Sequence, residues 1–341
     1  MGRPQQNSRC SIDRRRPPMN KWLILALLTP ALATAQKYET SDGKIRVAPV
    51  KMPYSGARNV PELSGGPDYL EEGGVVQWIE EAGGTVKPIP TVKLTEAEDK
   101  DYGEWHRLGL ANAHLGNIVA ENEREGYLTV GLLANCSSLS GILGGLQRSG
   151  PSRRPLKIGL VFIDAHGDIN TPETTLSGML GGMPVAVAAG MCLRNLRLES
   201  GLDIPLPERY IVMGAVRDTD PLEQELLDRS EVEHISTDDI RNRSEKIHAQ
   251  MERLSSLVDK IYIHIDMDVL DPKEVAGHPL TVPNGPTSME LAGALTEMFR
   301  YEKAAALGIA STPWGDRDTD GLSRQAAYNL IKGAIQGIKE R

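Results

Sequence analysis

The chain is poor in cysteine and has neither a long apolar run nor a basic tract. Its three cysteines are too few for a disulfide framework. Two of them, Cys136 and Cys192, follow the N-terminal segment that we expect to be cleaved on export, and they leave room for a single bridge. The apolar run at 22–28 is too short to cross a bilayer as a helix. We also find no internal repeat, no low-complexity segment and no linker rich enough to mark a second folded domain.

The N-terminal segment is typical of a secretory signal. A lysine precedes the apolar run at 22–28, and the small residues Ala33 and Ala35 predict cleavage after Ala35. Residues 1–18 are either an extended basic region of this signal, or they precede the true start at Met19. We therefore expect an N-terminal extension with a signal peptide at 1–35, and a secreted or periplasmic mature protein.

The mature chain, residues 36–341, is acidic. Residues 1–35 hold six basic residues and one acidic residue, so their removal leaves 32 Lys and Arg against 45 Asp and Glu, a net charge of −13. No contiguous basic segment remains, which argues against nucleic acid as a partner. We expect no membrane association once the signal has been cleaved.

From about Lys44 onward, short β-branched runs alternate with amphipathic stretches. The strand candidates are the segments 44–50, 127–134, 156–165, 210–216, 260–270 and 304–311. The main helix candidates are the segments 69–83, 139–148, 220–229, 247–257, 288–299 and 322–338. Apolar strands between helices predict a parallel sheet covered on both faces, in one doubly wound α/β domain. Such sheets bind ligands at the carboxyl ends of their strands.

Three of these strand ends carry side chains typical of metal ligands. They are Asp164, His166 and Asp168 after one strand, His264, Asp266 and Asp268 on one side of another, and Cys136 after a third. Carboxylates gathered at one point repel each other unless cations lie among them. Carboxylate and imidazole ligands suit Mn²⁺ or a similar divalent ion, and two such ions would generate hydroxide at neutral pH. The alternative is that these residues only start turns and cap helices.

Three motifs carry a resemblance to a known family: "DAHGDINTPETTLSG", "HIDMDVLDP" and "RDTDPLE". Together they are similar to the arginase/agmatinase (ureohydrolase) family, over most of the mature chain. The resemblance implies a three-layer α/β/α fold, a single domain around a parallel eight-stranded sheet, with two Mn²⁺ ions at the strand ends. It also implies a small-molecule substrate and an assembly of three or six copies, for which the sequence itself holds no signal.

The resemblance also assigns roles to individual residues. The implied metal ligands are Cys136, Asp164, His166, Asp168, Asp266 and Asp268, with Asp164 and Asp266 as bridges. Asn170 and Ser177 match residues that hold a substrate α-carboxylate, while Asp220 and its neighbour Glu223 match the α-amino side. The implied substrate is an α-amino acid rather than a bare amine. Taken alone, Asn170 and Ser177 would equally suit the capping of a helix or loop.

Cys136 is the first departure from the family, which has a histidine in a Gly-Gly-Asp-His-Ser motif where this chain reads "LLANCSS". A cysteine at a helix start is expected to have a lowered pKa, so a thiolate ligand is reasonable. Such a ligand would favour Zn²⁺ or Fe²⁺ more than an imidazole does. Alternatively, Cys136 is a small structural residue beside the site.

Two catalytic groups of the family are also missing. Gly181 stands where arginase has a histidine for proton transfer, and Ala310 stands where the family has a guanidinium-binding glutamate. His264 and His278 are the substitutes for the proton-transfer group, or hydrogen-bonding supports of the site. Without a buried carboxylate to pair with the guanidinium, plain L-arginine is a doubtful substrate. A hydroxylated guanidine or an amidine would depend less on that carboxylate.

These observations lead to three hypotheses about function. The first is a metal-dependent hydrolase in which metal-bound hydroxide attacks the C–N bond of a guanidino or amidino compound. The second is a catalytically silent periplasmic protein that binds an amino acid or a metal, motivated by Gly181 and Ala310. The third makes Cys136 a nucleophile, for which the sequence offers no base beyond His166. We rank them in this order.

Overall fold

The computed structural model describes residues 38–56, 64–151 and 154–341. The expected signal peptide and its cleavage site therefore lie outside the described residues. Those residues belong to one compact unit, Ala35–Arg341. In the described part of the chain, no helix combines the length and the apolarity needed to span a membrane.

The centre of the unit is a single eight-stranded sheet in the order β2-β1-β3-β8-β7-β4-β5-β6, with every neighbouring pair parallel. The strands are β1 (Ile45–Met52), β2 (Gly84–Val86), β3 (Leu128–Leu133), β4 (Ile158–Ile163), β5 (Ile211–Gly214), β6 (Glu233–Ile235), β7 (Lys260–Asp266) and β8 (Ala304–Ala310). The predicted parallel α/β fold is confirmed. The pattern of apolar runs missed β2 and β6, because each is a three-residue edge strand and β6 is largely exposed.

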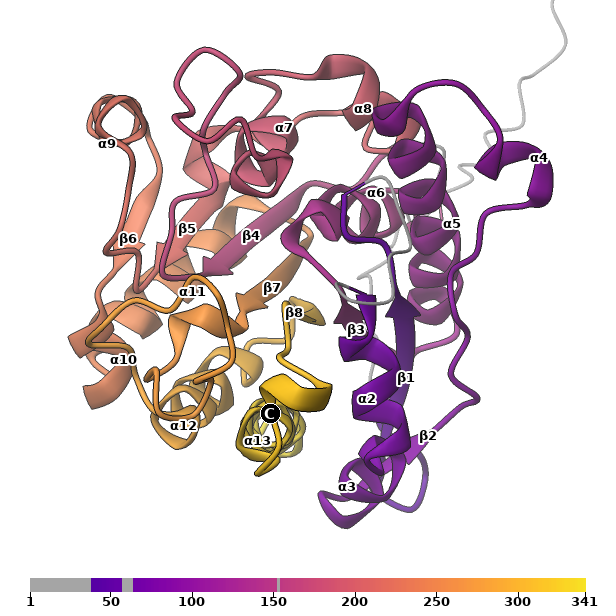
Figure 1. Cartoon of the computed structure of the whole chain (residues 1–341). Coiled ribbons are helices and arrows are strands. Elements are labelled where there is room, and N and C mark those ends of the chain that lie inside the picture. The colour runs from indigo at the N-terminus through magenta and orange to yellow at the C-terminus, as the bar shows by residue number, and fades with distance from the viewer. Residues whose placement is uncertain (1–37, 57–63, 152–153) are drawn as a thin grey trace, which may run out of the picture. The chain divides into compact units, whose positions relative to one another are not determined.

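Helices cover both faces of the sheet (Figure 1). One face packs against α5 (Glu104–Arg124) and α6 (Leu139–Gln147), with α7 (Pro184–Ala189) and α8 (Arg194–Glu199) beside them. The other packs against α11 (Glu245–Leu257) and α13 (Leu322–Lys339), with α12 (Ser288–Phe299) and α3 (Val75–Glu81) in the same layer. The remaining helices are α2 (Gly66–Glu72), α4 (Glu96–Asp99), α9 (Pro221–Leu227) and α10 (Thr237–Asn242). This is the expected three-layer arrangement.

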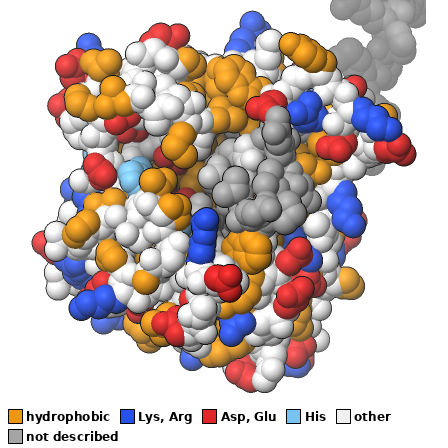
Figure 2. Space-filling view, viewed as in Figure 1, with side chains coloured by type: hydrophobic (Ala, Val, Ile, Leu, Met, Phe, Trp, Pro, Cys, Tyr) orange, Lys and Arg blue, Asp and Glu red, His pale blue; other side chains and the backbone are white. Residues whose placement is uncertain are grey.

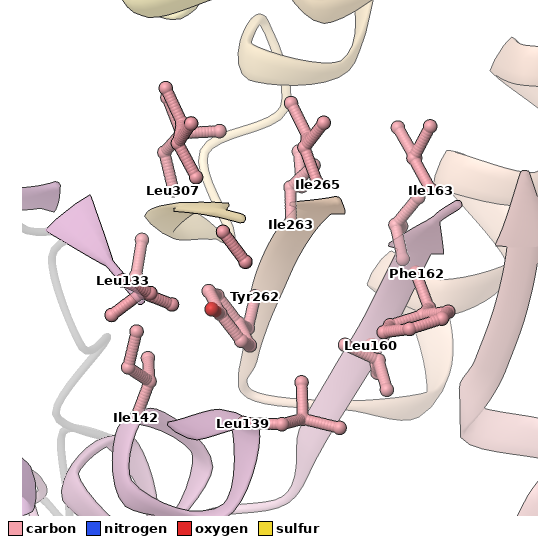
Figure 3. Close-up of a cluster of buried hydrophobic side chains, with 14 of the residues drawn as sticks. Leu133, Leu139, Ile142, Leu160, Phe162, Ile163, Tyr262, Ile263, Ile265 and Leu307 are labelled. Carbon is pink, nitrogen blue, oxygen red and sulfur yellow. The ribbon is translucent and has the colours of Figure 1, made fainter. Parts of the chain in front are cut away.

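The core explains why the central strands read as unbroken apolar runs. Every residue of β3, β4 and β8 is buried, since both faces of these strands are covered. Figure 3 shows buried side chains of β3, β4, β7, β8 and α6 on both sides of the sheet, with Tyr262 on the same side as Leu139 and Ile142 of α6. Neither Cys136 nor Cys192 forms a disulfide. The single bridge for which the sequence left room is therefore not made.

Candidate metal centre and substrate pocket

Strand order places the candidate ligands together. The strands β3, β8, β7 and β4 are neighbours in the sheet, and all four end at the same edge. Cys136 follows β3 in a single 3₁₀ turn, Ser311 follows β8, Asp266 is the last residue of β7 and Asp164 follows β4. Residues from four distant parts of the sequence thus meet at the carboxyl edge of the sheet, as doubly wound folds lead one to expect.

The four carboxylates of Asp164, Asp168, Asp266 and Asp268 are buried at this edge. Three overlapping groups of side chains offer ligand atoms that lie within 4.8 Å of one another. These groups are Cys136 with Asp164 and Asp168, Asp164 with His166 and Asp268, and Asp266 with Asp268 and His278. All six ligands implied by the resemblance are present, and His278 joins them as a seventh candidate.

His166 lies between two of the carboxylates. Its Nδ1 is 3.2 Å from Oδ2 of Asp268 and 3.4 Å from Oδ1 of Asp164, and its backbone N–H donates to the same Oδ1 over 2.7 Å. Burial lowers the pKa of His166, but hydrogen bonds and charges of Asp164 and Asp268 outweigh it and raise the pKa to about 11. In the absence of another cation, the imidazolium partly balances this cluster.

Charge compensation at the cluster is incomplete. Burial raises the pKa of Asp164, Asp168 and Asp266, and it raises the pKa of Asp268 to about 6; the negative charge of neighbouring carboxylates adds to each shift. Among the described residues that line the pocket, Arg317 is the only Lys or Arg. Buried carboxylates that destabilise each other's ionised form are a donor set that divalent cations stabilise. The residues therefore fit a metal centre.

The prediction that the pKa of Cys136 is lowered was wrong. The side chain is 1% exposed, and its 3₁₀ turn, Cys136–Ser138, is too short to offset the loss of solvation. Burial raises the pKa of the thiol well above its usual range, and the charge of Asp266 and two further aspartates raises it more. The S–H instead donates to Oδ2 of Asp266 over 2.8 Å. A metal ion bound at Sγ would remove this proton.

His264 and His278, the predicted proton-transfer groups, occupy different places. His264 is fully buried and does not line the pocket; its Nδ1 is 2.7 Å from the Tyr262 hydroxyl and its Nε2 is 3.2 Å from Sγ of Cys136. Burial lowers the pKa of His264 to about 3, so the ring is neutral. His278 lines the pocket, with Nε2 3.7 Å from Oδ1 of Asp266. Of these two histidines, His278 is therefore the one that can exchange a proton with a molecule in the pocket.

A pocket of about 460 Å³ opens in front of the carboxylates. Figure 2 shows that this face of the molecule is hollowed where acidic side chains and a histidine are visible. Asn170, Ser177, Asp220 and Glu223, the residues expected to hold an amino acid, all line the pocket. The structure thus brings the four together beside the acidic cluster.

Hydrogen bonds within the protein hold part of this set in place. The Nδ2 of Asn170 donates to Oδ2 of Asp220 over 3.2 Å, and Oδ1 of Asn170 accepts from the Thr174 hydroxyl over 2.8 Å. Buried Glu223 accepts from the backbone N–H groups of Ile169 and Asp220, which ties the start of α9 to the segment after β4. Ser177 is exposed at the mouth, where its Oγ accepts from the Met179 backbone N–H.

The positions of the two missing catalytic groups, Gly181 and Ala310, have different surroundings. Gly181 lines the pocket, and a Cβ added there would only touch the Asn135 side chain, at 3.4 Å from Nδ2. Ala310 is fully buried and does not line the pocket. The pocket wall that follows it contains Thr312, Trp314 and other residues without a carboxylate.

Sequence reasoning missed two residues that contact the cluster directly or through His264. Ser311 donates its hydroxyl to Oδ2 of Asp266 over 2.7 Å, and Tyr262 contacts His264. Ser311 and Asp168 both have positive φ, at 61° and 48°, a conformation that costs non-glycine residues energy and occurs often at functional sites. The position of Ser311 at the end of the predicted strand 304–311 was the one available signal, since serine is too common to stand out there.

Comparison with known proteins identifies the family of the chain. The arginase family profile matches residues 114–311, more than half of the chain. The chain is 29% identical over 243 residues to human mitochondrial arginase-2, covering 66% of each protein, and 27% identical over 257 residues to the arginase of Entamoeba histolytica, covering 72% of this chain and 82% of that one.

Solved structures share the fold. The arginase of Bacillus subtilis superposes with a TM-score of 0.73 at 20% identity, over 85% of this chain and 98% of that one. The formimidoylglutamase of the same organism superposes with a TM-score of 0.64 at 17% identity, over 88% and 89% of the two chains. The resemblance inferred from the three sequence motifs is confirmed, and the chain belongs to the arginase family.

Proposed function

We propose that the protein is a metal-dependent hydrolase that cleaves a C–N bond in a guanidino or amidino derivative of an α-amino acid. The observation that carries this proposal is the buried group of four aspartates with His166 and Cys136, open to a pocket lined by Asp220. These carboxylates, with His166 and Cys136, would hold two divalent ions. Mn²⁺ suits the oxygen ligands, whereas Cys136 favours Zn²⁺ or Fe²⁺.

When bound, such ions would supply Lewis acidity and would lower the pKa of a water molecule. The protein's own groups fix the arrangement. Ser311 and the backbone N–H of Asp268 donate to the two oxygens of Asp266, over 2.7 and 3.1 Å, and so hold its carboxylate in one orientation. Orienting ligands through further hydrogen bonds limits the reorganisation that the reaction requires.

The amino-acid end of the substrate would lie against the segment after β4 and the start of α9. The carboxylate of Asp220 suits a protonated α-amino group, and the exposed hydroxyl of Ser177 suits an α-carboxylate. Binding this end would hold the reacting carbon near the aspartates, a pre-organisation that lowers the entropic part of the barrier.

Among the described residues, the pocket wall that follows β8 has no acidic side chain to pair with the reacting end of the substrate. A guanidinium buried there without a carboxylate partner would lose on the order of 3–5 kcal/mol relative to a paired one. An amidine such as a formimino group presents fewer N–H donors that require an acceptor than a guanidinium does, and a hydroxylated guanidine is a weaker base. We therefore propose that these compounds are better substrates than L-arginine.

We assign proton transfer to His278. Water adds across the scissile C–N bond, so the leaving amine must gain a proton. Since Gly181 offers no side chain and His264 does not reach the pocket, His278 is the imidazole that is placed to supply it, along with His166 among the ligands.

Metal analysis followed by a substrate screen tests this proposal. The purified protein would be loaded with Mn²⁺, and the metal content counted for the wild type and for Asp164→Asn. Close to two ions in the wild type and fewer in the variant are expected. Release of amine from L-arginine, an N-hydroxylated arginine and an N-formimino amino acid would then be compared. Stabilisation by these compounds without any metal-dependent product would contradict the proposed hydrolase.

Export of the protein is a separate proposal. It is supported by the lysine, the apolar run and the small residues that precede Gln36. N-terminal sequencing of the protein recovered from secreting cells should begin at Gln36. An intact N-terminus in the cytoplasmic fraction would contradict it.

A further inference from the structure

A continuous line of polar contacts runs from the core of the sheet to the candidate metal ligands. The Tyr262 hydroxyl is 2.7 Å from Nδ1 of His264, and Nε2 of His264 is 3.2 Å from Sγ of Cys136. Sγ of Cys136 in turn lies 2.8 Å from Oδ2 of Asp266. The four side chains are buried, with Tyr262 and His264 fully so.

The direction of each hydrogen bond follows from the surroundings of Tyr262. Figure 3 shows its ring among apolar side chains that include Leu133, Leu139 and Ile142. In the described part of the chain, His264 Nδ1 is the hydrogen-bond partner found for its hydroxyl. A buried O–H without an acceptor is costly, so Tyr262 donates to Nδ1. The proton of the neutral imidazole is then on Nε2, which donates to Sγ of Cys136.

The sheet is built to let these rings reach Cys136. Strand β8 lies between β7, which carries His264, and β3, which precedes Cys136. Gly308 of β8 pairs with His264 on one side and with Gly131 of β3 on the other. A Cβ at Gly308 would overlap the Tyr262 hydroxyl and lie 3.2 Å from His264 Nδ1. The absence of a side chain at Gly308 therefore creates the space that the two rings occupy.

The ring of His264 is also fixed from its other side. Phe162 of β4, its partner in the parallel register, stacks on it with ring centroids 5.2 Å apart and planes inclined by 5°. The imidazole is thus held in orientation by stacking and in tautomer by Tyr262. Since an apolar side chain could fill the same space without the cost of burying polar groups, this arrangement points to a specific role at Sγ.

We propose that Tyr262 and His264 are positioning residues that present Cys136 as a metal ligand. The Nε2–H of His264 orients Sγ toward Asp164 and Asp266 and stabilises the sulfur when it binds an ion. Neither ring touches the substrate pocket. The inference rests on the metal centre of the proposed function and extends it to a residue pair that acts through the ligand.

Co²⁺ is a suitable probe, since a cobalt–thiolate bond has a charge-transfer absorption in the near ultraviolet that oxygen and nitrogen ligands lack. The test compares Co²⁺ titrations of the wild type, Cys136→Ser, His264→Asn, His264→Gln and Tyr262→Phe. In His264→Asn the amide replaces Nδ1 and can still accept from Tyr262, but no donor reaches Sγ. In His264→Gln the amide nitrogen occupies the place of Nε2 and keeps that donor.

The wild type should show the thiolate band and Cys136→Ser should lose it. His264→Asn should bind the Co²⁺ that gives the band about 10–100-fold more weakly, and Tyr262→Phe should show a smaller loss in the same direction. His264→Gln should remain within a few-fold of the wild type. Thermal unfolding of each metal-free protein shows whether the variants are folded, and the Gln variant keeps the test decisive if the Asn variant is not.

Four results would overturn the inference. Equal Co²⁺ affinity and an equal band in the wild type and a folded His264→Asn would show that the donor has no role. A folded His264→Gln protein that loses the band would show that the donor to Sγ does not maintain Cys136 as a ligand. Co²⁺ bound by the wild type without a thiolate band would exclude Cys136 as a ligand, but it would leave the proposed hydrolase intact. No Co²⁺ binding at all would contradict both this inference and the proposed hydrolase.

Discussion

The hydroxyl of Ser311 donates to Oδ2 of Asp266 over 2.7 Å while the backbone of Ser311 is held at a φ of 61°. The backbone N–H of Ser311 donates to the carbonyl of Leu133, which fixes the turn that leaves β8. A left-handed conformation at a non-glycine residue is unfavourable, so the protein accepts a cost here to aim one hydroxyl at a buried carboxylate.

Replacement of Ser311 should separate this strain from the hydrogen bond. Ser311→Ala loses the hydrogen bond and keeps the strain, whereas Ser311→Gly loses both. We expect Ser311→Gly to be more stable than Ser311→Ala by about 1 kcal/mol, measured by urea unfolding of the metal-free proteins. Both variants should bind metal more weakly than the wild type. Equal stability of the two variants would contradict the assignment of strain to this turn.

Removal of one charge from the aspartate cluster should stabilise the metal-free protein. It should also reduce the stabilisation that bound metal provides. Asp168→Asn suits this test because asparagine tolerates the positive φ of 48° found there. Relief of repulsion among buried carboxylates should raise the free energy of unfolding of the metal-free protein by about 1 kcal/mol.

Added Mn²⁺ should reverse this order. A bound ion stabilises the wild type by about 2.7 kcal/mol when its free concentration is 100 times the dissociation constant, and the variant should gain less. Thermal unfolding with and without Mn²⁺ measures both effects. If Asp168→Asn destabilises the metal-free protein, the carboxylates are not in conflict and the argument for bound cations weakens.

The role proposed for Asp220 can be tested without disturbing α9. Asparagine is as good an N-cap residue as aspartate, so Asp220→Asn should keep the helix start while removing the charge opposite the α-amino group. Loss of a charge-assisted hydrogen bond of about 1.5–3 kcal/mol predicts a kcat/KM lower by roughly 10- to 100-fold for α-amino acid substrates. The matched analogue without an α-amino group should show little change. An equal loss for both compounds would point to a structural role for Asp220.

Alkaline pH should destabilise the protein through Tyr38. Its hydroxyl donates to Oε2 of Glu123 over 2.6 Å, and Oε1 of Glu123 is 2.6 Å from Nζ of Lys260. Burial raises the pKa of Tyr38 well above its usual range, and the charge of Glu123 raises it further. Above about pH 10 the unfolded chain therefore loses a proton that the folded chain retains. The free energy of unfolding should be constant below that pH and fall above it.

The Tyr38→Phe variant provides the comparison. It should be less stable at neutral pH by about 1.5–3 kcal/mol, since the buried carboxylate loses a donor. Its stability should then fall less steeply than that of the wild type above about pH 10, because one of the raised tyrosine pKa values is gone while that of Tyr262 remains. Parallel alkaline slopes for the two proteins would show that Tyr38 does not carry this effect.

The residues that stand at the strand ends could be predicted from the sequence. Alternation along 260–266 places Tyr262, His264 and Asp266 on one side of a strand, and unbroken apolar runs require a sheet covered on both faces. The motifs also identified the family. These features are local, because side-chain direction and burial of a central strand are set within a few residues.

Which strand ends meet, and how burial and neighbouring charges shift the pKa values of their residues, depends on the tertiary structure. Cys136 and Asp266 are 130 positions apart, and they touch because β3 and β7 lie on either side of β8 and end at the same edge of the sheet. Burial among carboxylates then reversed the expected pKa of Cys136, and the same packing removed His264 from the pocket. Strand order and burial depend on contacts across the whole chain, so no local pattern contains them.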